Sequence, residues 1–536
     1  MGRTAGERGV LMGRSLKKKL CLVCLLASFL CALVAAQEEK NSKRFRLLNI
    51  TFHPEGRIER SALLRYLRID MAHIYDSQEE LEQFLDSVHQ RLENSRFFEQ
   101  ISHTYSVSAY TDDGIDLVDA EFSFTVSNSL LAFPSPSFDS NTGTKLSLIV
   151  RDQNFMGLMR PLMFSIIGQL GTEEEPENTS KVTGGFAFYN ELPFSMGKTQ
   201  NSWFNAVNFA WTIGDSSPSF NFRSGINVGI PVGKKKNILN FNFTQSVVHD
   251  FHYKKYDDEL YFIESGSVSL PLTIATINKK APLIYTPFIR ASYTWDTDGI
   301  SEANTKLNGT PRLSVGQTTS ITHINWEGNF RKGYAFSTTQ SISRDFHAKK
   351  TEKMIIPLFS ISWRNYLSWK YAGIYTNFSF FATHNDSINT GNLLRGILDK
   401  QVFRSYRIDN DNYALATPSA FTANIDIPLH IITTDWLKWF HISDSSSGFG
   451  KLLSYLDFEL QVSPFLDIAL IKNRATGKAY SIEDGLFSTG LEFLVYPQRW
   501  KSYVIRASLG FDISRHSEWR SPRKDYELFI GIGHHF

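Results

Sequence analysis

Residues 526–536 alternate in character, and this alternation limits what the chain can fold into more than any other stretch. The even-numbered positions are largely apolar and include Leu528, Ile530, Ile532 and Phe536. The odd-numbered positions include Gly531 and Gly533, which are too small to form a second apolar face. A period of two indicates a strand with one apolar face. In water such an edge strand invites aggregation, whereas the last strand of a membrane barrel pairs with the first. We therefore expect a closing barrel strand, with an ordinary terminal strand of a soluble sheet as the alternative.

The composition is compatible with a membrane barrel. No apolar run after residue 40 approaches the roughly 20 residues that a membrane helix needs. Aromatic residues make up 14% of the 536 residues, yet the mean hydropathy is only -0.22. A barrel produces this combination because its apolar residues alternate with polar ones, although a large soluble all-β protein would produce it too. The net charge of +2 gives no reason to expect a nucleic-acid partner.

The start of the chain has the layout of a secretory signal peptide. Lysines at 17–19 precede an apolar run over residues 20–34, and Ala35-Ala36 then gives way to polar residues. We expect cleavage after Ala36, so that residues 1–36 are a leader, with a membrane anchor helix as the alternative. Met12 is a plausible start. All three cysteines lie at positions 21–31, so the mature chain would contain no disulfide, thiolate ligand or thiol nucleophile.

Residues 44–127 predict a small α+β domain. Residues 45–52 are a strand candidate, and residues 60–68 suggest one or two helical turns. Ser77 and Glu80 form a capping box before a helical apolar face that contains Leu81, Leu85, Val88 and Leu92. Two alternating stretches then flank Asp113-Gly114, which is typical of a hairpin turn.

This element order, with the turn Ser95-Arg96-Phe97-Phe98-Glu99, resembles a POTRA domain. Such periplasmic modules precede the barrels of the BamA/TamA-type outer-membrane assembly superfamily. The family usually has a glycine before the aromatic residue of that turn, where this chain has Arg96. The resemblance implies that the domain binds unfolded client polypeptides or accessory periplasmic proteins by adding a strand to a sheet edge. A simple spacer is the alternative.

The rest of the chain predicts a transmembrane β-barrel. Pro and Ser residues at 133–137 suggest a linker over 128–141, and residues 142–536 show recurring alternation with no convincing helix. At about 25 residues per strand and connection, this length gives about 16 antiparallel strands. A soluble β-sandwich or propeller is the alternative, but the sequence has no repeat of blade length.

Two motifs extend the resemblance into the barrel. Asn154-Phe155-Met156-Gly157 resembles the Asn-x-x-Gly turn of the superfamily. The stretch at 393–397 contains Leu394-Arg395-Gly396 within a long polar connection, and long connections are usually functional or disordered. In the superfamily a hydrophobic-Arg-Gly-aromatic loop folds back into the barrel interior, or lumen. Here Ile397 replaces the aromatic residue.

Asp426 and Asp467 are single carboxylates in apolar strand candidates. By alternation they face away from the apolar, lipid-facing neighbours, because a carboxylate on the lipid face is unfavourable. Their positions match the acidic lumen residues that hold the loop arginine in the superfamily. The resemblance therefore implies that Arg395 docks against both aspartates. Alternatively, Arg395 is a solvated loop charge and the aspartates are ordinary lumen residues.

Nothing in the sequence indicates an enzyme, a metal site or a cofactor. There is no Gly-rich phosphate loop, no metal-spaced histidine cluster and no nucleophile elbow, and adjacent residues such as His534 and His535 point to opposite faces of a strand.

Together these patterns predict a bacterial outer-membrane protein that contacts lipid, with its POTRA-like domain in the periplasm. The resemblance implies insertion or translocation of unfolded outer-membrane or secreted proteins. A client strand would pair at a weak seam between the first and last strands, formed by Ile530, Gly531, Ile532, Gly533 and Phe536. Two-partner secretion translocators share the architecture but usually have two POTRA domains and a plug helix, neither of which is evident. A passive pore or structural surface protein is a competing interpretation, and so is a soluble secreted β protein.

Overall fold

The computed structural model describes most of the chain after residue 42. The described residues are 43–67, 69–112, 114–139, 143–171, 181–233, 237–249, 257–277, 281–302, 304–305, 311–346, 355–383, 394–395, 417–442, 447–472, 477–514 and 526–533. The expected leader, Gly396, His534, His535 and Phe536 lie outside these residues. The predictions made for them therefore stay predictions.

The N-terminal region is an α+β sheet with the predicted order of elements. Its strands are arranged β2-β1-β4-β3. Its elements are β1 (Arg44–Glu55), α2 (Arg60–Leu67), β2 (Ile74–Tyr75), α3 (Gln78–Ser95), β3 (Phe98–Asp112) and β4 (Ile115–Val126). The two-residue strand β2 is an addition to the predicted order, and it pairs only with Phe45 and Arg46 of β1.

Helix α3 forms where the sequence predicts it, for two local reasons. At its start, the backbone N–H of Glu80 donates to the Ser77 hydroxyl at 3.2 Å, and the Glu80 carboxylate accepts from the backbone of Asp76 at 2.8 Å. These bonds satisfy donors that a helix start leaves unpaired. Along its length, Leu81, Leu85, Val88 and Leu92 are all fully buried. Their spacing of three and four residues places them on one helical face.

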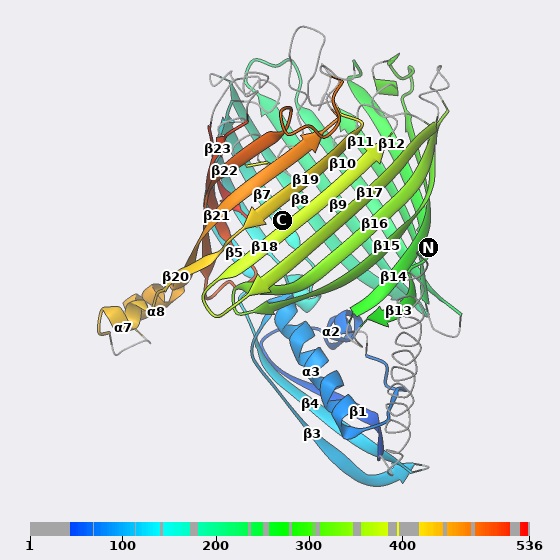
Figure 1. Cartoon of the computed structure of the whole chain (residues 1–536), viewed down its shortest axis with the longest axis vertical. Helices are drawn as coiled ribbons and strands as arrows, with labels where there is room; N and C mark the ends of the chain where they lie inside the picture. Colours follow the sequence, from blue (N-terminus) through cyan, green and yellow to red (C-terminus); the bar gives the residue numbers. More distant parts are fainter. Residues whose placement is uncertain are drawn as a thin grey trace, which may run out of the picture. The chain divides into compact units, whose positions relative to one another are not determined.

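The chain folds as two compact units. One takes its described residues from 43–53, 69–89 and 102–123, and the other from 54–67, 90–101 and 124 onwards. The second unit contains a closed barrel of antiparallel strands (Figure 1). Its strands are β5 (Leu130–Asp139), β6 (Gly143–Asp152), β7 (Leu162–Leu170), β8 (Val182–Met196), β9 (Thr199–Thr212), β10 (Ser219–Val232), β11 (Asn237–His249), β12 (Leu260–Ser269), β13 (Leu272–Ile277), β14 (Ala281–Trp295), β15 (Arg312–Glu327), β16 (Phe330–Asp345), β17 (Ile355–Ser368), β18 (Gly373–Thr383), β19 (Ser419–Asp426), β20 (Leu429–Thr433), β21 (Phe458–Ile471), β22 (Leu486–Pro497), β23 (Ile505–Asp512) and β24 (Tyr526–Ile532).

The predicted fold class, an antiparallel β-barrel, is confirmed, and the wall has more strands than the expected sixteen or so. Within the described residues, twenty strand segments form the wall, but β12 and β13 both pair with β14, and β19 and β20 both pair with β21. Each of these two pairs is one interrupted strand, so the wall has eighteen strands. The sequence-based number was lower because several hairpin turns are very short, such as the two residues between β8 and β9 and between β15 and β16.

The expected linker at 128–141 is corrected by the structure, because residues 130–139 form strand β5. This strand pairs with β6 along its whole length, from Leu130 opposite Asp152 to Asp139 opposite Gly143. Pro134 and Pro136 lack a backbone donor, which is why their stretch of the sequence indicated irregular chain. They are two residues apart, so their missing N–H groups would point to the same side of the strand, as edge strands allow.

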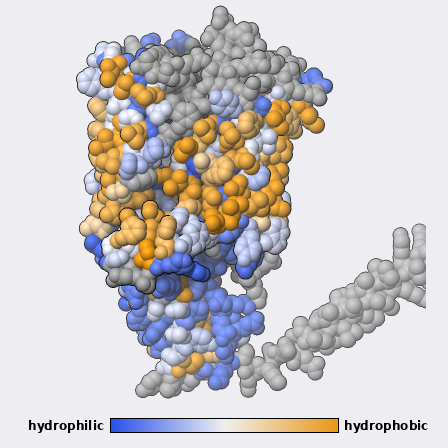
Figure 2. All heavy atoms as spheres, turned by 90° about the vertical axis from the view of Figure 1, so that its left-hand side faces the viewer, coloured by the Kyte–Doolittle hydropathy of each residue, from blue (hydrophilic) through white to orange (hydrophobic). Residues whose placement is uncertain are grey.

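The two faces of the wall differ in polarity as a membrane barrel requires. Large apolar side chains are exposed on the outer face of many strands, including Ile166, Phe243, Val315 and Trp363. On the face that Figure 2 presents, hydrophobic residues gather over the wall. The side chains at the alternate, inward-facing positions include polar pairs, such as Ser314 and Ser343, whose hydroxyl oxygens lie 2.7 Å apart. Within the described part of the chain, none of the helices has the length and apolar character to cross a membrane.

The Asn-x-x-Gly motif forms a tight turn within the second unit. The Asn154 side chain donates to the backbone oxygen of Arg57 at 3.0 Å and accepts from the backbone N–H of Met159 at 2.9 Å. Gly157 has a φ of 81°, and a Cβ there would lie 3.0 Å from the Glu59 nitrogen. The turn therefore needs both an asparagine side chain and a glycine.

Arg96 occupies the position where the resembled family has glycine, and its φ is 57°. A side chain in this left-handed region is strained. Within the second unit its guanidinium donates to the Asn329 side chain at 2.8 Å and to the backbone oxygen of Lys501, and it lies 4.3 Å from the Trp326 ring centroid. These contacts offset the strain, and burial lowers the Arg96 pKa to about 10.

Candidate functional site

The candidate site is a buried ion cluster around Arg395. The Arg395 side chain is fully buried, and its neighbour Leu394 is only 2% exposed. Its Nε and Nη2 atoms donate to the two oxygens of Asp467 at 3.0 and 2.8 Å, and its backbone N–H donates to the same carboxylate at 2.9 Å. Asp467 therefore binds both the fork of the guanidinium and the backbone that carries it, which fixes the position of this loop residue.

Asp426 completes the pair of aspartates named from the sequence. Its Oδ1 lies 2.6 Å from Nη2 of Arg395. Asp426 comes from β19 and Asp467 from β21, two adjacent strands in which Asp426 is paired with Phe465 and Asn424 with Asp467. In β21 every second residue from Gln461 to Ile471 is buried, so Asp467 belongs to the inner face of the wall. The structure thus brings Arg395, Asp426 and Asp467 together.

Two further charged residues belong to the cluster, and the sequence-based prediction did not include them. Glu492 on β22 accepts from Nη1 of Arg395 at 3.3 Å and from Nη1 of Arg506 on β23 at 3.1 Å. Both Glu492 and Arg506 are 3% exposed. Glu492 is the single charge of β22 and lies between Leu491 and Phe493, and Arg506 is a charge that follows Ile505 in β23. The alternation argument that selected the aspartates could therefore have found them.

Aromatic rings support both guanidinium groups. The Cζ atom of Arg395 lies 3.8 Å from the Phe465 ring centroid, and that of Arg506 lies 4.3 Å from the Phe529 ring centroid. Such stacking suits the planar arginine group. Phe529 belongs to β24, so the cluster extends from β19 across β21, β22 and β23 to the last strand.

Two glycines leave space for these rings. A Cβ on Gly490 would lie 2.8 Å from the Phe465 ring and 2.0 Å from the backbone oxygen of Leu509. A Cβ on Gly531 would lie 2.4 Å from the Phe529 ring. Gly531 is therefore needed for packing as well as being a weak strand former, a role that the sequence did not indicate.

The seam between the last and first strands is short. In the described residues, β24 pairs with β5 only at Phe529 with Asp139 and at Ile530 with Phe138. The pairing of β24 with β23 runs over seven residues, from Ile532 opposite Ile505 to Tyr526 opposite Phe511. Of the predicted seam residues, Ile530 is paired with β5, whereas Gly531, Ile532 and Gly533 lie beyond the paired stretch. Among the residues that the structure describes, the closure thus depends on few backbone hydrogen bonds.

The cluster has the chemistry of a structural lock. Two guanidinium groups face the carboxylates of Asp426, Asp467 and Glu492, and hydrogen bonds, ion pairs and ring stacking join them. Breaking a buried pair by removing one partner costs about 3–5 kcal/mol. Among the described residues, no group of three His, Cys, Asp or Glu side chains could hold a metal ion.

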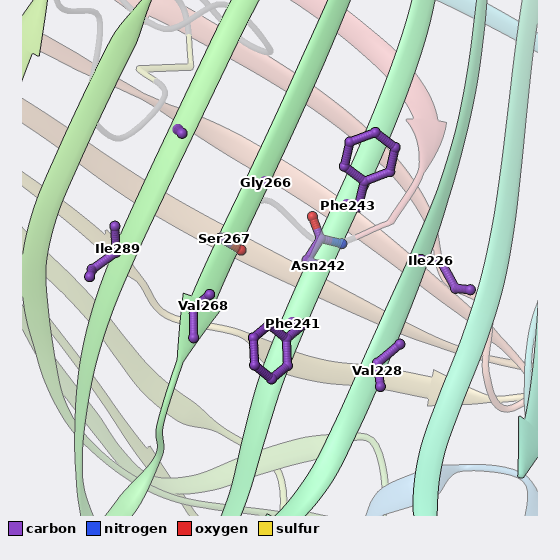
Figure 3. Close-up of a pocket in the computed structure, with 10 residues that line it drawn as sticks. Ile226, Val228, Phe241, Asn242, Phe243, Gly266, Ser267, Val268 and Ile289 are labelled. Atoms are coloured by element: carbon purple, nitrogen blue, oxygen red, sulfur yellow. The ribbon is translucent and has the colours of Figure 1, made fainter. Parts of the chain in front are cut away.

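A hollow of about 330 Å³ lies elsewhere, over strands β10 to β14 (Figure 3). Its lining is almost entirely apolar and includes Ile226, Phe241, Phe243, Val268 and Ile289. All five side chains are exposed, and Gly266 contributes no side chain. The hollow therefore belongs to the apolar outer face and is separate from the Arg395 cluster.

Many solved structures match the chain, among them three that align with most of it. CdiB from Acinetobacter baumannii aligns at 12% identity over 91% of this chain and 74% of that chain, with a TM-score of 0.45. CdiB from Escherichia coli aligns at 10% identity over 91% and 76%, also with a TM-score of 0.45. BamA from Haemophilus ducreyi lacking POTRA domains 1-3 aligns at 12% identity over 91% and 85%, with a TM-score of 0.36. No protein-family model and no curated protein matches the chain.

Proposed function

We propose that this chain is an outer-membrane protein of the BamA-like superfamily that inserts or translocates other polypeptides, with a client strand pairing at the seam between β24 and β5. The observation that carries the proposal is that the described residues of that seam pair at only two positions. Unpaired backbone groups at a strand edge are a template for another strand. A seam held by few hydrogen bonds can open at a small cost in free energy. The freed edges of β24 and β5 can then pair with a client strand.

The first strand contributes to the weakness of the seam. Pro134 and Pro136 offer no N–H group, and β5 pairs with β6 over its full length. Gly533, at a φ of 112°, follows the last strand and departs from extended geometry. Both sides of the seam therefore contain residues that disfavour a long, regular ladder.

The Arg395 cluster has a supporting role in this proposal. It joins the inner faces of β19, β21, β22 and β23, and through Phe529 it reaches β24. A locked wall beside a weak seam lets the seam open while the neighbouring strands keep their register. We propose that Arg395, Asp426 and Asp467 hold the loop against the wall for this purpose.

The N-terminal sheet supports a second contact with clients. Strand β3 is fifteen residues long and forms one edge of the sheet, and the other edge is covered only by the two-residue strand β2. Both edges can accept an extended chain. We propose that this POTRA-like domain lies in the periplasm and delivers client strands.

A reversible lock of the seam tests the proposal. The variant F138C/I530C joins register partners across the seam, and the control L509C/L528C joins register partners of β23 and β24. The three natural cysteines, at positions 21, 24 and 31, are replaced by serine in both variants, so the pairing is unambiguous. In cells depleted of the wild-type protein, we expect the oxidised seam variant to lose assembly of other outer-membrane proteins and to regain it under reductant. The control should support assembly in both states.

A passive pore would give a different result. Normal levels of every other outer-membrane protein after depletion would remove the assembly function. Unchanged assembly with a fully cross-linked seam would remove the seam mechanism. A steady conductance that neither cross-link nor Arg395→Ala alters would favour the passive channel.

A further inference from the structure

A helical hairpin between β20 and β21 carries apolar side chains that nothing in the described chain covers. It consists of α7 (Trp436–Trp439) and α8 (Gly448–Tyr455), neither of which was expected from the sequence. Figure 1 shows the hairpin beyond the end of β20, away from the wall. Five large side chains are at least 44% exposed: Trp439, Phe440, Phe449, Leu452 and Leu456.

The base of the hairpin is firmly held. Asp457 accepts from the Thr434 hydroxyl at 3.2 Å and from the backbone of Trp436 at 2.9 Å, and the Gln498 side chain donates to the backbone oxygen of Thr434 at 3.1 Å. The Trp436 indole donates to the backbone oxygen of Leu456 at 3.0 Å. The apolar side chains are therefore presented in a fixed arrangement.

Helix α8 is amphipathic. Phe449, Leu452 and Leu456 follow the i, i+3, i+7 spacing of a single helical face, and Leu453 beside them is buried. Lys451 is exposed and lies on the opposite face by the same spacing. An apolar face opposed by a basic residue is typical of helices that lie in a membrane interface.

The apolar face continues the outer surface of the barrel. Leu429 and Ile431 of β20 are exposed just before the hairpin. The backbone N–H of His430 donates to the oxygen of Tyr371 at 2.8 Å, which places the turn between β17 and β18 beside β20. In that turn Trp369 and Tyr371 are 59% and 57% exposed. Exposed Trp and Tyr side chains are typical of the level where a barrel meets the lipid headgroups.

We propose that the hairpin is an interfacial anchor whose apolar face lies in the boundary between headgroups and acyl chains of the bilayer beside the barrel. This inference rests on the proposed membrane location of the barrel. Lipid is the occupant because the face is continuous with the apolar wall through β20 and with the exposed aromatic residues of the adjacent turn. The charges do not favour anionic lipid, since Lys438 and Lys451 are matched by Asp435 and Asp457. The anchor should therefore work in zwitterionic bilayers.

Site-specific labelling of the full chain tests the anchor. The three natural cysteines are replaced by serine, and a single cysteine labelled with an environment-sensitive fluorophore is introduced by Leu452→Cys or Phe449→Cys. Lys451→Cys is the matched control on the opposite face, and Val315→Cys on the outer wall reports whether the barrel is in lipid. Each protein is reconstituted into phosphatidylcholine vesicles, with a nitroxide quencher on the lipid or iodide in the buffer.

We expect the labels at 449 and 452 to be quenched several-fold more by the lipid nitroxide than the label at 451, and the order to reverse with iodide. Equal iodide quenching at 449, 452 and 451, with lipid quenching at 315, would overturn the anchor and leave the membrane barrel intact. Iodide quenching at 315 as well would overturn both. Lipid quenching only after addition of phosphatidylglycerol would contradict the apolar basis of the anchor.

Discussion

At the scale of single residues, Arg395 illustrates how a buried charge can specify one arrangement. Its guanidinium is fully buried and is bound by Asp467, Asp426 and Glu492. Removing a charged group from water costs several kcal/mol of free energy. Only well-placed ion pairs, with hydrogen bonds to all the remaining donors, offset that cost. Other positions of the loop would lose these bonds, so the cluster selects the docked position.

Replacing Arg395 tests this account. We expect Arg395→Ala to lower the free energy of unfolding by about 3–5 kcal/mol, because it leaves the carboxylates of Asp426 and Asp467 buried without the guanidinium that binds both of them. Arg395→Lys should lower it less, since an ammonium keeps the charge but cannot form the two-pronged bond to Asp467. Urea unfolding of the barrel in detergent micelles measures these values.

The control for Arg395 is Lys332→Ala, which removes an exposed ion pair with Glu327 at 3.0 Å. This change should stay within about 1 kcal/mol of wild type. An Arg395→Ala protein as stable as the Lys332→Ala protein would contradict the buried lock.

At the scale of elements, strand β22 lies close to the backbone of β23 and to the aromatic ring of β21 that supports Arg395. Gly490 is paired with Phe465 on one side and Gly510 on the other. The Phe465 ring occupies the space that a side chain at 490 would need. The aromatic support of the cluster therefore depends on the absence of a Cβ in the adjacent strand.

A glycine comparison tests this dependence. Gly490→Ala should destabilise the barrel by about 1–3 kcal/mol, because the methyl group overlaps the Leu509 oxygen and the Phe465 ring. Gly184→Ala on β8 is the matched control, since a Cβ there meets nothing within 4 Å. The control should be neutral or slightly stabilising. The temperature at which each barrel loses its folded mobility in SDS gels provides the comparison, and equal shifts for both variants would refute it.

At the scale of the whole molecule, the closed wall separates an apolar outer face from a polar inner face. An eighteen-stranded wall is wide enough to leave an aqueous interior. Val315 and Ser314 are adjacent in β15 and illustrate the difference, because Val315 is 52% exposed outside and the Ser314 hydroxyl bonds to Ser343 inside. A lipid environment outside follows from this distribution.

Adjacent arginine substitutions test which face meets lipid. Val315→Arg should reduce the stability of the reconstituted barrel by on the order of 2–4 kcal/mol, as expected for a charge on the lipid face. Ser314→Arg should have a much smaller effect, since its side chain points to the interior. The folded fraction after reconstitution into vesicles is measured over a range of urea. Equal effects at the two positions would contradict the membrane-facing assignment.

The sequence predicted the fold class because that class depends on local periodicity. Alternation identifies a strand and its apolar face without knowledge of its neighbours, and the capping box and apolar face of α3 are likewise local. The strand β5 was missed because two prolines obscured its alternation. Helices α7 and α8 were missed because four and eight residues are too few to establish a helical period.

The ion cluster was only partly accessible from the sequence. Asp426 and Asp467 stood out as single charges in apolar strands, and Arg395 stood out through the resemblance of its loop. Their partners Glu492 and Arg506, and the rings of Phe465 and Phe529, come from strands whose neighbours are fixed only when the barrel closes. The same holds for Gly531, whose packing role depends on a ring in its own strand that must point inward.

The sequence by itself therefore determined that this chain forms alternating strands with an apolar outer face, preceded by a small α+β domain. Only the tertiary structure decided how many strands close the wall, that the described residues of the closing seam pair at two positions, and which charges meet at Arg395. The physical reason is that periodicity is a property of neighbouring residues, whereas register and closure depend on strands far apart in the chain.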